Sequence, residues 1–253
     1  MFHRFGDSAF ADHALEATPM KRFWDQAACV AEGDFFAIHL DGKPVRLPTG
    51  AALRVATREL GEALAAEWQA AGGARDGDMS WEDVPLTRLT GTAAERIAPD
   101  PAATIAAIAK YAETDLLCYR AEDEELAQRQ QAAWQPWLEW AARELGAELR
   151  ATRGIMPVRQ GEAALVALHA AVAQLSPIGL SALGILVPAL GSAVLGLAVM
   201  RGAISSAEAH GLAVLDEIFQ EARWGLDWEA EERRVRVAAE LVLAARLAEL
   251  SAG

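Results

Sequence analysis

The sequence predicts an α+β fold: a small N-terminal mixed domain with β-hairpins, followed by a C-terminal all-helical orthogonal bundle. In the first hundred residues, short apolar runs alternate with turn residues, which is typical of strands joined by tight turns. Beyond about residue 101, apolar residues recur every three or four positions, as in amphipathic helices. Pro99 and Pro101 separate the two patterns. We therefore expect a loose N-terminal arm at 1–20, an α+β domain at 21–100 and a helical domain at 101–253.

The N-terminal half contains strong hairpin signals. Ala27–Val30 and Phe35–Leu40 are candidate strands with a turn at Gly33-Asp34 between them. Asp41-Gly42 is a dipeptide that favours a two-residue hairpin turn, and Val45–Leu47 is the expected returning strand. Neither G-x-G-x-x-G nor G-x-x-x-x-G-K occurs, so the glycines of this region predict turns and not a phosphate-binding loop.

Two helices are expected in the rest of this domain. Thr57 is a candidate N-cap for the first, which carries Leu60, Leu64 and Trp68 on one face. The segment from Trp81 to Pro85 is expected to be extended. The second helix has a buried face made of Leu86, Leu89, Thr90, Ala93 and Ile97.

The segment from Tyr111 to Trp140 predicts two helices joined by an acidic bend. The first helix keeps a single face through Ile105, Ile108, Ala109, Ala112 and Leu116. The second helix, expected to reach about Leu149, has its apolar face at Leu126, Gln130, Trp134, Trp137, Leu138, Ala141 and Leu145. Pro136 either kinks this helix or restarts it.

An uncharged run from Ile178 to Met200 has the length of a membrane-spanning helix. Pro188 and Gly191-Ser192 interrupt it, and Arg201 is the only nearby flanking charge. We therefore predict two short buried helices, at about 178–189 and 192–202, and no stable membrane insertion.

Capping residues mark the last two helices. Ser205 and Glu208 form the S-x-x-E pattern of a capping box, which begins a helix that ends at Trp224-Gly225. Its expected buried stripe is Leu212, Leu215, Phe219 and Ala222. Asp227 is the expected cap of the final helix. The residues expected to pack that helix into the bundle are Val235, Ala238, Leu241, Val242 and Ala245.

Composition excludes several classes of protein. With 36 acidic and 23 basic residues the formal net charge is −13, and no basic stripe offsets it, so nucleic-acid binding is not expected. The acidity serves solubility or steers the chain toward a basic partner. Cys29 and Cys118 lie far apart in the sequence and predict buried free thiols in a reducing compartment. The N-terminus resembles neither a secretory signal nor a presequence, so a bacterial cytoplasmic protein is expected.

The common catalytic motifs are missing. We find no G-x-S-x-G, no H-E-x-x-H, no S-x-x-K and no paired cysteine ligands. His169 lies beside an apolar stripe with no second ligand at i+3 or i+4. The sequence therefore predicts a binding protein without catalytic residues, metal or cofactor.

Seven short motifs then define a resemblance. They are TDLLCYR (114–120), QQAAWQPWLEWA (130–141), KRFW (21–24), LDGKPVRLPTG (40–50), EW (67–68), VPLTRLTGTA (84–93) and DEIFQEARWG (216–225). In order and spacing they resemble the ATP-twelve family, assembly chaperones for the alpha subunit of the ATP synthase catalytic head. The resemblance covers roughly residues 20 to 230.

This resemblance implies a function and a partner. It implies a chaperone that binds the unassembled alpha subunit until beta subunits replace it, promoting assembly of the F(1) sector without hydrolysing nucleotide. A monomer is expected. The alternative is a helical protein that binds or transforms a small molecule in the seam between its two domains.

The resemblance also places a functionally important acid at Asp216 or Glu217. On a helix, Asp216 shares one face with Gln220 and Arg223, whereas Glu217 shares another with Glu221 and Trp224. Either carboxylate could pair with an arginine of the partner, or could be a solvated acid beside a buried stripe. The candidate partner-binding residues are Asp216, Glu217, Glu221 and Trp224.

Overall fold

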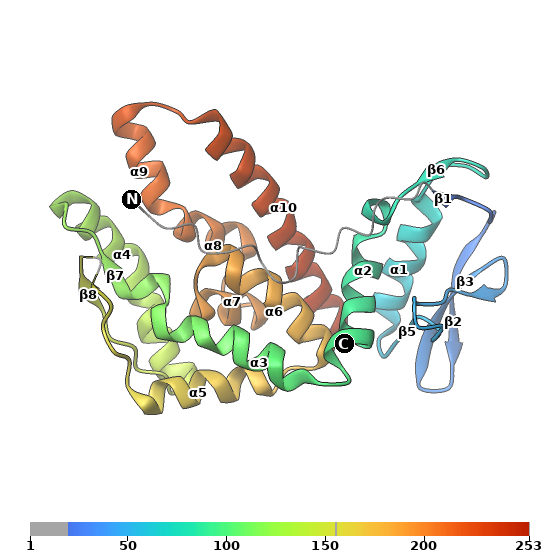
Figure 1. Cartoon of the computed structure of the whole chain (residues 1–253), viewed down its shortest axis with the longest axis horizontal. Coiled ribbons are helices and arrows are strands. Elements are labelled where there is room, and N and C mark those ends of the chain that lie inside the picture. Colours follow the sequence, from blue (N-terminus) through green and yellow to red (C-terminus); the bar gives the residue numbers. More distant parts are fainter. Residues whose placement is uncertain (1–19, 155, 253) are drawn as a thin grey trace. The chain divides into compact units, whose positions relative to one another are not determined.

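The computed structural model describes residues 20–154 and 156–252, so the predicted arm lies almost entirely outside the described residues. The described chain forms two compact units, one of residues 20–96 with 249–252 and the other of residues 97–248. Hairpins occupy the N-terminal part and helices the rest, which confirms the α+β class (Figure 1). Whether the units are domains that fold separately, with the boundaries expected from the sequence, stays a prediction.

A four-stranded antiparallel sheet forms the first unit's β layer. Its strands are β2 (Ala27–Glu32), β3 (Phe35–Leu40), β4 (Lys43–Pro44) and β5 (Arg54–Val55). At the tip of the β3–β4 hairpin, Asp41 and Gly42 both have positive φ (47° and 78°), as the predicted tight turn requires. The returning strand begins directly after this turn, so the expectation of a strand at Val45–Leu47 is wrong. Val45 and Leu47 are buried in the core instead.

Helix α1 (Arg58–Ala70) covers this sheet with the predicted face of Leu60, Leu64 and Trp68, all buried (Figure 1). Thr57 occupies the N-cap position, but its hydroxyl donates to the backbone oxygen of Leu250 (2.6 Å) and makes no cap. At the other end, Nη1 of the buried Arg22 donates to three carbonyls, those of Gln69, Ala71 and Gly73. These hydrogen bonds satisfy backbone carbonyls at the end of α1 that have no donor within the helix.

The remaining elements of the first half are short. They are β1 (Met20–Lys21), β6 (Asp78–Met79), the 3₁₀ turn η1 (Trp81–Asp83), α2 (Pro85–Thr92) and the π-helical turn η2 (Ala93–Ile97). The extended segment expected from Trp81 to Pro85 is therefore wrong. Ser80 and Asp83 form a capping box there, which favours a helical turn.

Helices dominate the second unit. They are α3 (Pro101–Ala109), α4 (Glu124–Trp140), α5 (Glu162–Ala173), α6 (Pro177–Leu190), α7 (Ala193–Met200), α8 (Ser206–Ala213), α9 (Leu215–Trp224) and α10 (Trp228–Ser251), whose last residues belong to the first unit. Short elements join them: η3 (Lys110–Thr114), η4 (Leu116–Cys118), β7 (Tyr119–Arg120), the π-helical turn η5 (Ala141–Leu145) and β8 (Thr152–Arg153). The strands β7 and β8 pair in parallel.

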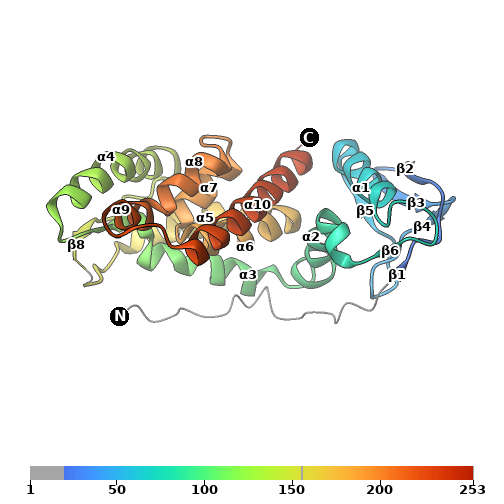
Figure 2. The ribbon, with the colours of Figure 1, turned by 90° about the horizontal axis from the view of Figure 1, so that it is seen from above.

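The uncharged run forms the centre of this unit as the predicted pair of helices, α6 and α7. Gly191 turns the chain between them with a φ of +63°, and Ser192 caps α7. In both views α7 lies between α4 and α6 (Figures 1 and 2). Among the residues described, no helix is both long and apolar enough to cross a membrane.

The single helix expected through Leu116 is interrupted. Helix α3 ends at Ala109, a 3₁₀ turn follows, and Asp115 leaves the helical conformation (φ −57°, ψ 131°). The Asp115 carboxylate is fully buried and accepts hydrogen bonds from the backbone nitrogens of Leu117 (3.1 Å) and Val194 (3.1 Å). It therefore joins the start of η4 to the N-terminus of α7.

The other helix predictions need smaller corrections. Helix α4 continues through Pro136 and passes into η5, which ends at Leu145 before the left-handed Gly146 (φ +69°) and does not reach Leu149. The helix expected from residue 206 to Trp224 is broken at Val214 into α8 and α9, where Gly211 and the β-branched Val214 lower helix propensity.

The packing predicted for the last two helices is also partly wrong. Of the stripe expected in α8 and α9, Phe219 is buried but Ala222 is exposed. In α10, Leu241 packs inward as expected, whereas Val235 and Val242 are 66% and 54% exposed. The exposed valines leave one face of α10 open.

Candidate partner-binding site

Helix α9, the central element of the candidate site, is held mainly by polar contacts. Phe219 is the one residue of α9 that is fully buried. The guanidinium groups of Arg129 and Arg223 lie 5.1 and 4.4 Å from the centre of its ring. A single buried side chain gives α9 little apolar contact with the rest of the fold. The charged groups around Phe219 therefore help to hold the helix in position.

Asp216 attaches α9 to α4. Its Oδ1 accepts a hydrogen bond of 2.7 Å from Nε2 of Gln130, a side chain that is 2% exposed. Oε1 of Gln130 in turn accepts from the backbone nitrogen of Ala121 (2.6 Å). Burial raises the pKa of the half-buried Asp216, against the opposing effect of the Gln130 hydrogen bond. Asp216 is thus part of the packing between the two helices.

Glu217 and Glu221 attach α9 to α10 through one arginine. The Arg234 guanidinium donates to both oxygens of Glu221 (2.7 and 2.9 Å) and lies 3.4 Å from Glu217. The second partner of Glu217 is Arg233, at 3.2 Å. Hydrogen bonding to Glu221 raises the pKa of Arg234. The Glu217 side chain is 43% exposed against 17% for Glu221, so Glu217 is the more accessible carboxylate.

A third set of ion pairs holds the C-terminal end of α9. Arg223 lies 2.7 Å from Asp123 and 3.1 Å from Glu125, both in the first turn of α4. The structure therefore shows the two helix faces that the spacing predicted. Asp216 and Arg223 turn toward α4, whereas Glu217 and Glu221 turn toward α10. Sequence analysis missed Gln130 and Arg234 as the partners, since no spacing rule connects positions on different helices.

Apolar side chains gather where α9 ends. Trp224 is 79% exposed, and Leu226 and Trp228 follow it around Gly225 with 49% and 71% exposure. Gly225 has a φ of +98°, so the chain turns sharply at this point. We call Trp224, Leu226 and Trp228 the α9–α10 corner. Exposed aromatic side chains this close together in the chain are candidates for a protein interaction site.

The described residues offer little for metal or redox chemistry. Within the two described stretches, no three His, Cys, Asp or Glu side chains are grouped to hold a metal ion. Both cysteines are free thiols, with Cys118 buried and Cys29 half-buried. Burial raises the pKa of Cys118 to about 12, so this thiol stays protonated and unreactive at neutral pH.

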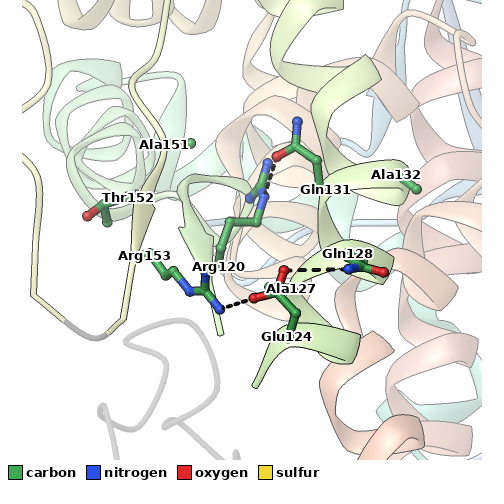
Figure 3. A pocket seen from close by; sticks show the side chains of 9 residues that line it. All are labelled: Arg120, Glu124, Ala127, Gln128, Gln131, Ala132, Ala151, Thr152 and Arg153. Carbon is green, nitrogen blue, oxygen red and sulfur yellow. Dashed lines mark hydrogen bonds and ion pairs between the residues drawn. The ribbon is translucent and has the colours of Figure 1, made fainter. Parts of the chain in front are cut away.

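A pocket of about 520 Å³ lies between α4 and β8 (Figure 3). Its polar groups are largely committed to each other. Arg120 donates to Gln131 and to two backbone carbonyls, and Arg153 pairs with Glu124 at 2.7 Å. Nη2 of Arg120 is buried and has no hydrogen-bond partner among the described residues. The remaining lining side chains are alanines, glutamines and a threonine, which do not form a catalytic set.

Comparisons with known proteins identify the family to which this chain belongs. The sequence model of the ATP12 chaperone protein family matches residues 21–142. A crystal structure of Atp12 from Paracoccus denitrificans is 41% identical, with a TM-score of 0.87, covering 91% of this chain and 98% of that one. An aspartate-to-lysine mutant of the same protein matches equally well, covering 91% and 97%. A putative chaperone from Agrobacterium tumefaciens is 36% identical, with a TM-score of 0.84 and coverage of 93% and 87%.

The fold is therefore that of a family of assembly chaperones. The chain belongs to the ATP12 family of ATP synthase assembly factors, which confirms the resemblance inferred from its motifs.

Proposed function

We propose that this chain binds the unassembled alpha subunit of the ATP synthase F(1) sector and promotes F(1) assembly without catalysing a reaction. Family membership supports the class of function, and the exposed α9–α10 corner supports the mode of binding. An unassembled subunit exposes a surface that is meant for burial, and such surfaces aggregate. A chaperone that covers this surface prevents aggregation until another subunit replaces it.

The corner is suited to binding that must later be reversed. Its two tryptophans offer large apolar contact areas, while the helix beneath them is fixed by ion pairs. A contact of a few aromatic side chains is smaller than a permanent subunit interface, so the final partner can displace it. We propose that the chaperone acts as a monomer in the bacterial cytoplasm.

We propose different roles for the four candidate residues. Trp224 inserts into the alpha subunit as an apolar anchor, and Glu217 offers its exposed carboxylate to a partner arginine in exchange for Arg233. Asp216 and Glu221 contribute to the same face and also hold α9 in place through Gln130 and Arg234.

Two single substitutions separate these roles. We expect Asp216→Ala to lower the free energy of unfolding by about 1–2 kcal/mol, because the buried amide of Gln130 loses its acceptor. We expect Glu217→Ala to change it by less than about 0.5 kcal/mol and to reduce capture of the alpha subunit. Urea unfolding and a capture assay on each variant measure the two effects. Full capture by Glu217→Ala would remove this carboxylate from the site.

Protection of the alpha subunit from aggregation tests the function itself. Light scattering of dilute, denaturant-free alpha subunit should rise with time, and an equimolar amount of this chain should suppress the rise. The alternative function is binding of a small molecule, although the pocket beside α4 lies within the second unit and not in the seam where the sequence analysis placed such a site. Co-purification of a small molecule, together with unchanged scattering, would favour that alternative over the chaperone.

A further inference from the structure

Helix α10 has an open apolar face. Trp228, Val235 and Val242 follow one another at intervals of seven residues and are 71%, 66% and 54% exposed. Residues seven apart lie on the same side of an α-helix, and the exposed Ala239 falls between the two valines on that side. We call these four residues the α10 stripe. At a rise of 1.5 Å per residue, it is about 21 Å long.

The opposite face of α10 already carries the helix's packing. Ala230, Leu241, Ala244 and Leu247 are buried there. The α10 stripe is therefore additional to the face that holds the helix in the fold. Exposed apolar residues scattered singly are ordinary, but three at heptad spacing form a surface that fits another helix.

The Trp228 end of the stripe is acidic. Glu229, Glu231 and Glu232 lie in the first turns of α10, and none of them forms an ion pair with any described residue. Asp227, immediately before them, caps the helix by accepting from the backbone nitrogens of Glu229 (3.0 Å) and Ala230 (3.2 Å). A partner that covers Trp228 therefore meets carboxylates that form no ion pair, with Arg236 one turn further along the helix, and these carboxylates favour lysine or arginine.

We propose that the α10 stripe is a second docking face for the client, and that its occupant is an amphipathic helix of the alpha subunit. Seven-residue spacing matches the apolar residues of a helix packed alongside α10. The side chain of that helix over Trp228 is flanked by lysine or arginine, which pair with Glu229, Glu231 and Glu232. This inference rests on the proposed function and deepens it, since it adds a face and the chemistry of what covers it.

An antiparallel second copy of this chain fits the stripe poorly. In an antiparallel pairing that places Trp228 of one copy against Val242 of the other, Glu240 lies opposite Ala230, between Glu229 and Glu231. A parallel pairing brings Glu231 toward Arg236 of the other copy, so repulsion between carboxylates does not oppose that register. Like charges directly opposed destabilise a helix pair, so the charges of α10 select against the antiparallel pairing, and the mass of the purified chain tests the parallel one.

The stripe continues the α9–α10 corner. Trp228 belongs to both surfaces, because it is the first residue of α10 and follows Trp224 and the Gly225 turn in the chain. A client segment could therefore contact the corner and then follow α10. Glu217, the accessible acid of α9, pairs with Arg233 and Arg234 of α10, which turn away from the stripe and hold α9 against α10.

A matched pair of valine substitutions tests the stripe. Val166 on α5 is 61% exposed, close to the 66% of Val235, and it belongs to the same unit. We expect Val235→Lys to weaken binding of purified alpha subunit at least about tenfold, as for a central apolar contact. We expect Val166→Lys to bind within about twofold of the unsubstituted chain. Circular dichroism and thermal unfolding show that both variants remain folded.

A charge variant provides an independent test. Replacing Glu229, Glu231 and Glu232 together by glutamine retains the apolar stripe, and should weaken binding at low salt and flatten its salt dependence. Unchanged binding by both this variant and Val235→Lys would overturn the inference while leaving the proposed function intact. Failure of the unsubstituted chain to bind alpha subunit would overturn both. A dimeric mass that becomes monomeric in Val235→Lys would assign the stripe to a second copy and also overturn the inference.

Discussion

Replacing Asp115 by alanine should destabilise the protein more than any other single change considered for this chain. Its carboxylate is 0% exposed and accepts from the backbone nitrogens of Leu117 and Val194, with further hydrogen bonds to Ser192 and Ala193. Alanine would leave these buried donors without an acceptor, so at pH 5 we expect the free energy of unfolding to fall by about 3–5 kcal/mol. Urea unfolding measures it, with the exposed Glu240→Ala as the control.

The effect of Asp115→Ala should depend on pH in a defined direction. Desolvation raises the pKa of Asp115 to about 6 against the lowering effect of its hydrogen bonds. Because the pKa of Asp115 in the folded state exceeds the ordinary value of 3.8, the native state binds the proton more tightly than the unfolded state. The free energy of unfolding therefore falls as the pH rises from about 3.8 to about 6. The whole effect of this pKa difference amounts to about 3 kcal/mol, of which about half falls between pH 5 and pH 8. The cost of Asp115→Ala should thus be smaller at pH 8 than at pH 5, and an equal cost would contradict the raised pKa.

The second large effect is expected at Gly196, where α7 approaches α6 closely. A Cβ atom at this position would lie 2.6 Å from Cγ2 of Val187 and 3.0 Å from Cδ1 of Leu183. Valine is stiff at χ1, so the helices must separate to admit the methyl group. We expect Gly196→Ala to lower the free energy of unfolding by about 1–3 kcal/mol despite the better helix propensity of alanine.

Gly211 provides the matched control for that substitution. It also lies within a helix, α8, but nothing comes within 4 Å of a Cβ placed there. Gly211→Ala should therefore stabilise the protein by about 0.5–1 kcal/mol. The two glycine variants should shift the urea midpoint in opposite directions. A stabilised Gly196→Ala would show that the contact between α6 and α7 is looser than the structure indicates.

Local signals predicted those parts of the fold whose chemistry lies within a few residues. Asp41-Gly42 specified its hairpin because both residues tolerate positive φ. Ser205 and Glu208 formed the predicted capping box, and Gly191 divided the uncharged run as expected. Short pairs such as β1 with β6 were missed because strands of two residues carry no alternation to detect.

Features that depend on distant partners could not be predicted. Asp115 was read as part of a helix, although its role is to cap α7, whose first residue lies far along the chain. Val235 and Val242 have the same helical spacing as Leu241 and its buried neighbours, so periodicity alone could not show which face of α10 stays open. The ion pairs of Arg234 with Glu217 and Glu221 likewise depend on how two helices meet.

In the candidate site, too, local features were predicted and contacts with other helices were not. The motif DEIFQEARWG led to the correct helix, and helical spacing assigned its acids to two faces. Neither predicted that Asp216 would bond to Gln130, whereas the exposure of Trp224 is what its place among the candidate partner-binding residues requires. Burial of a polar side chain depends on the groups that neighbouring helices offer, which a single sequence does not display.

Direct binding to the free alpha subunit tests the central claim most closely. Purified chain and free alpha subunit should be mixed in equimolar amounts and separated by size-exclusion chromatography with light scattering. Our account predicts a complex of one chain with one alpha subunit, from which added beta subunits release the chaperone. Separate elution of the two proteins, or a chaperone that remains bound once alpha and beta have assembled, would contradict it.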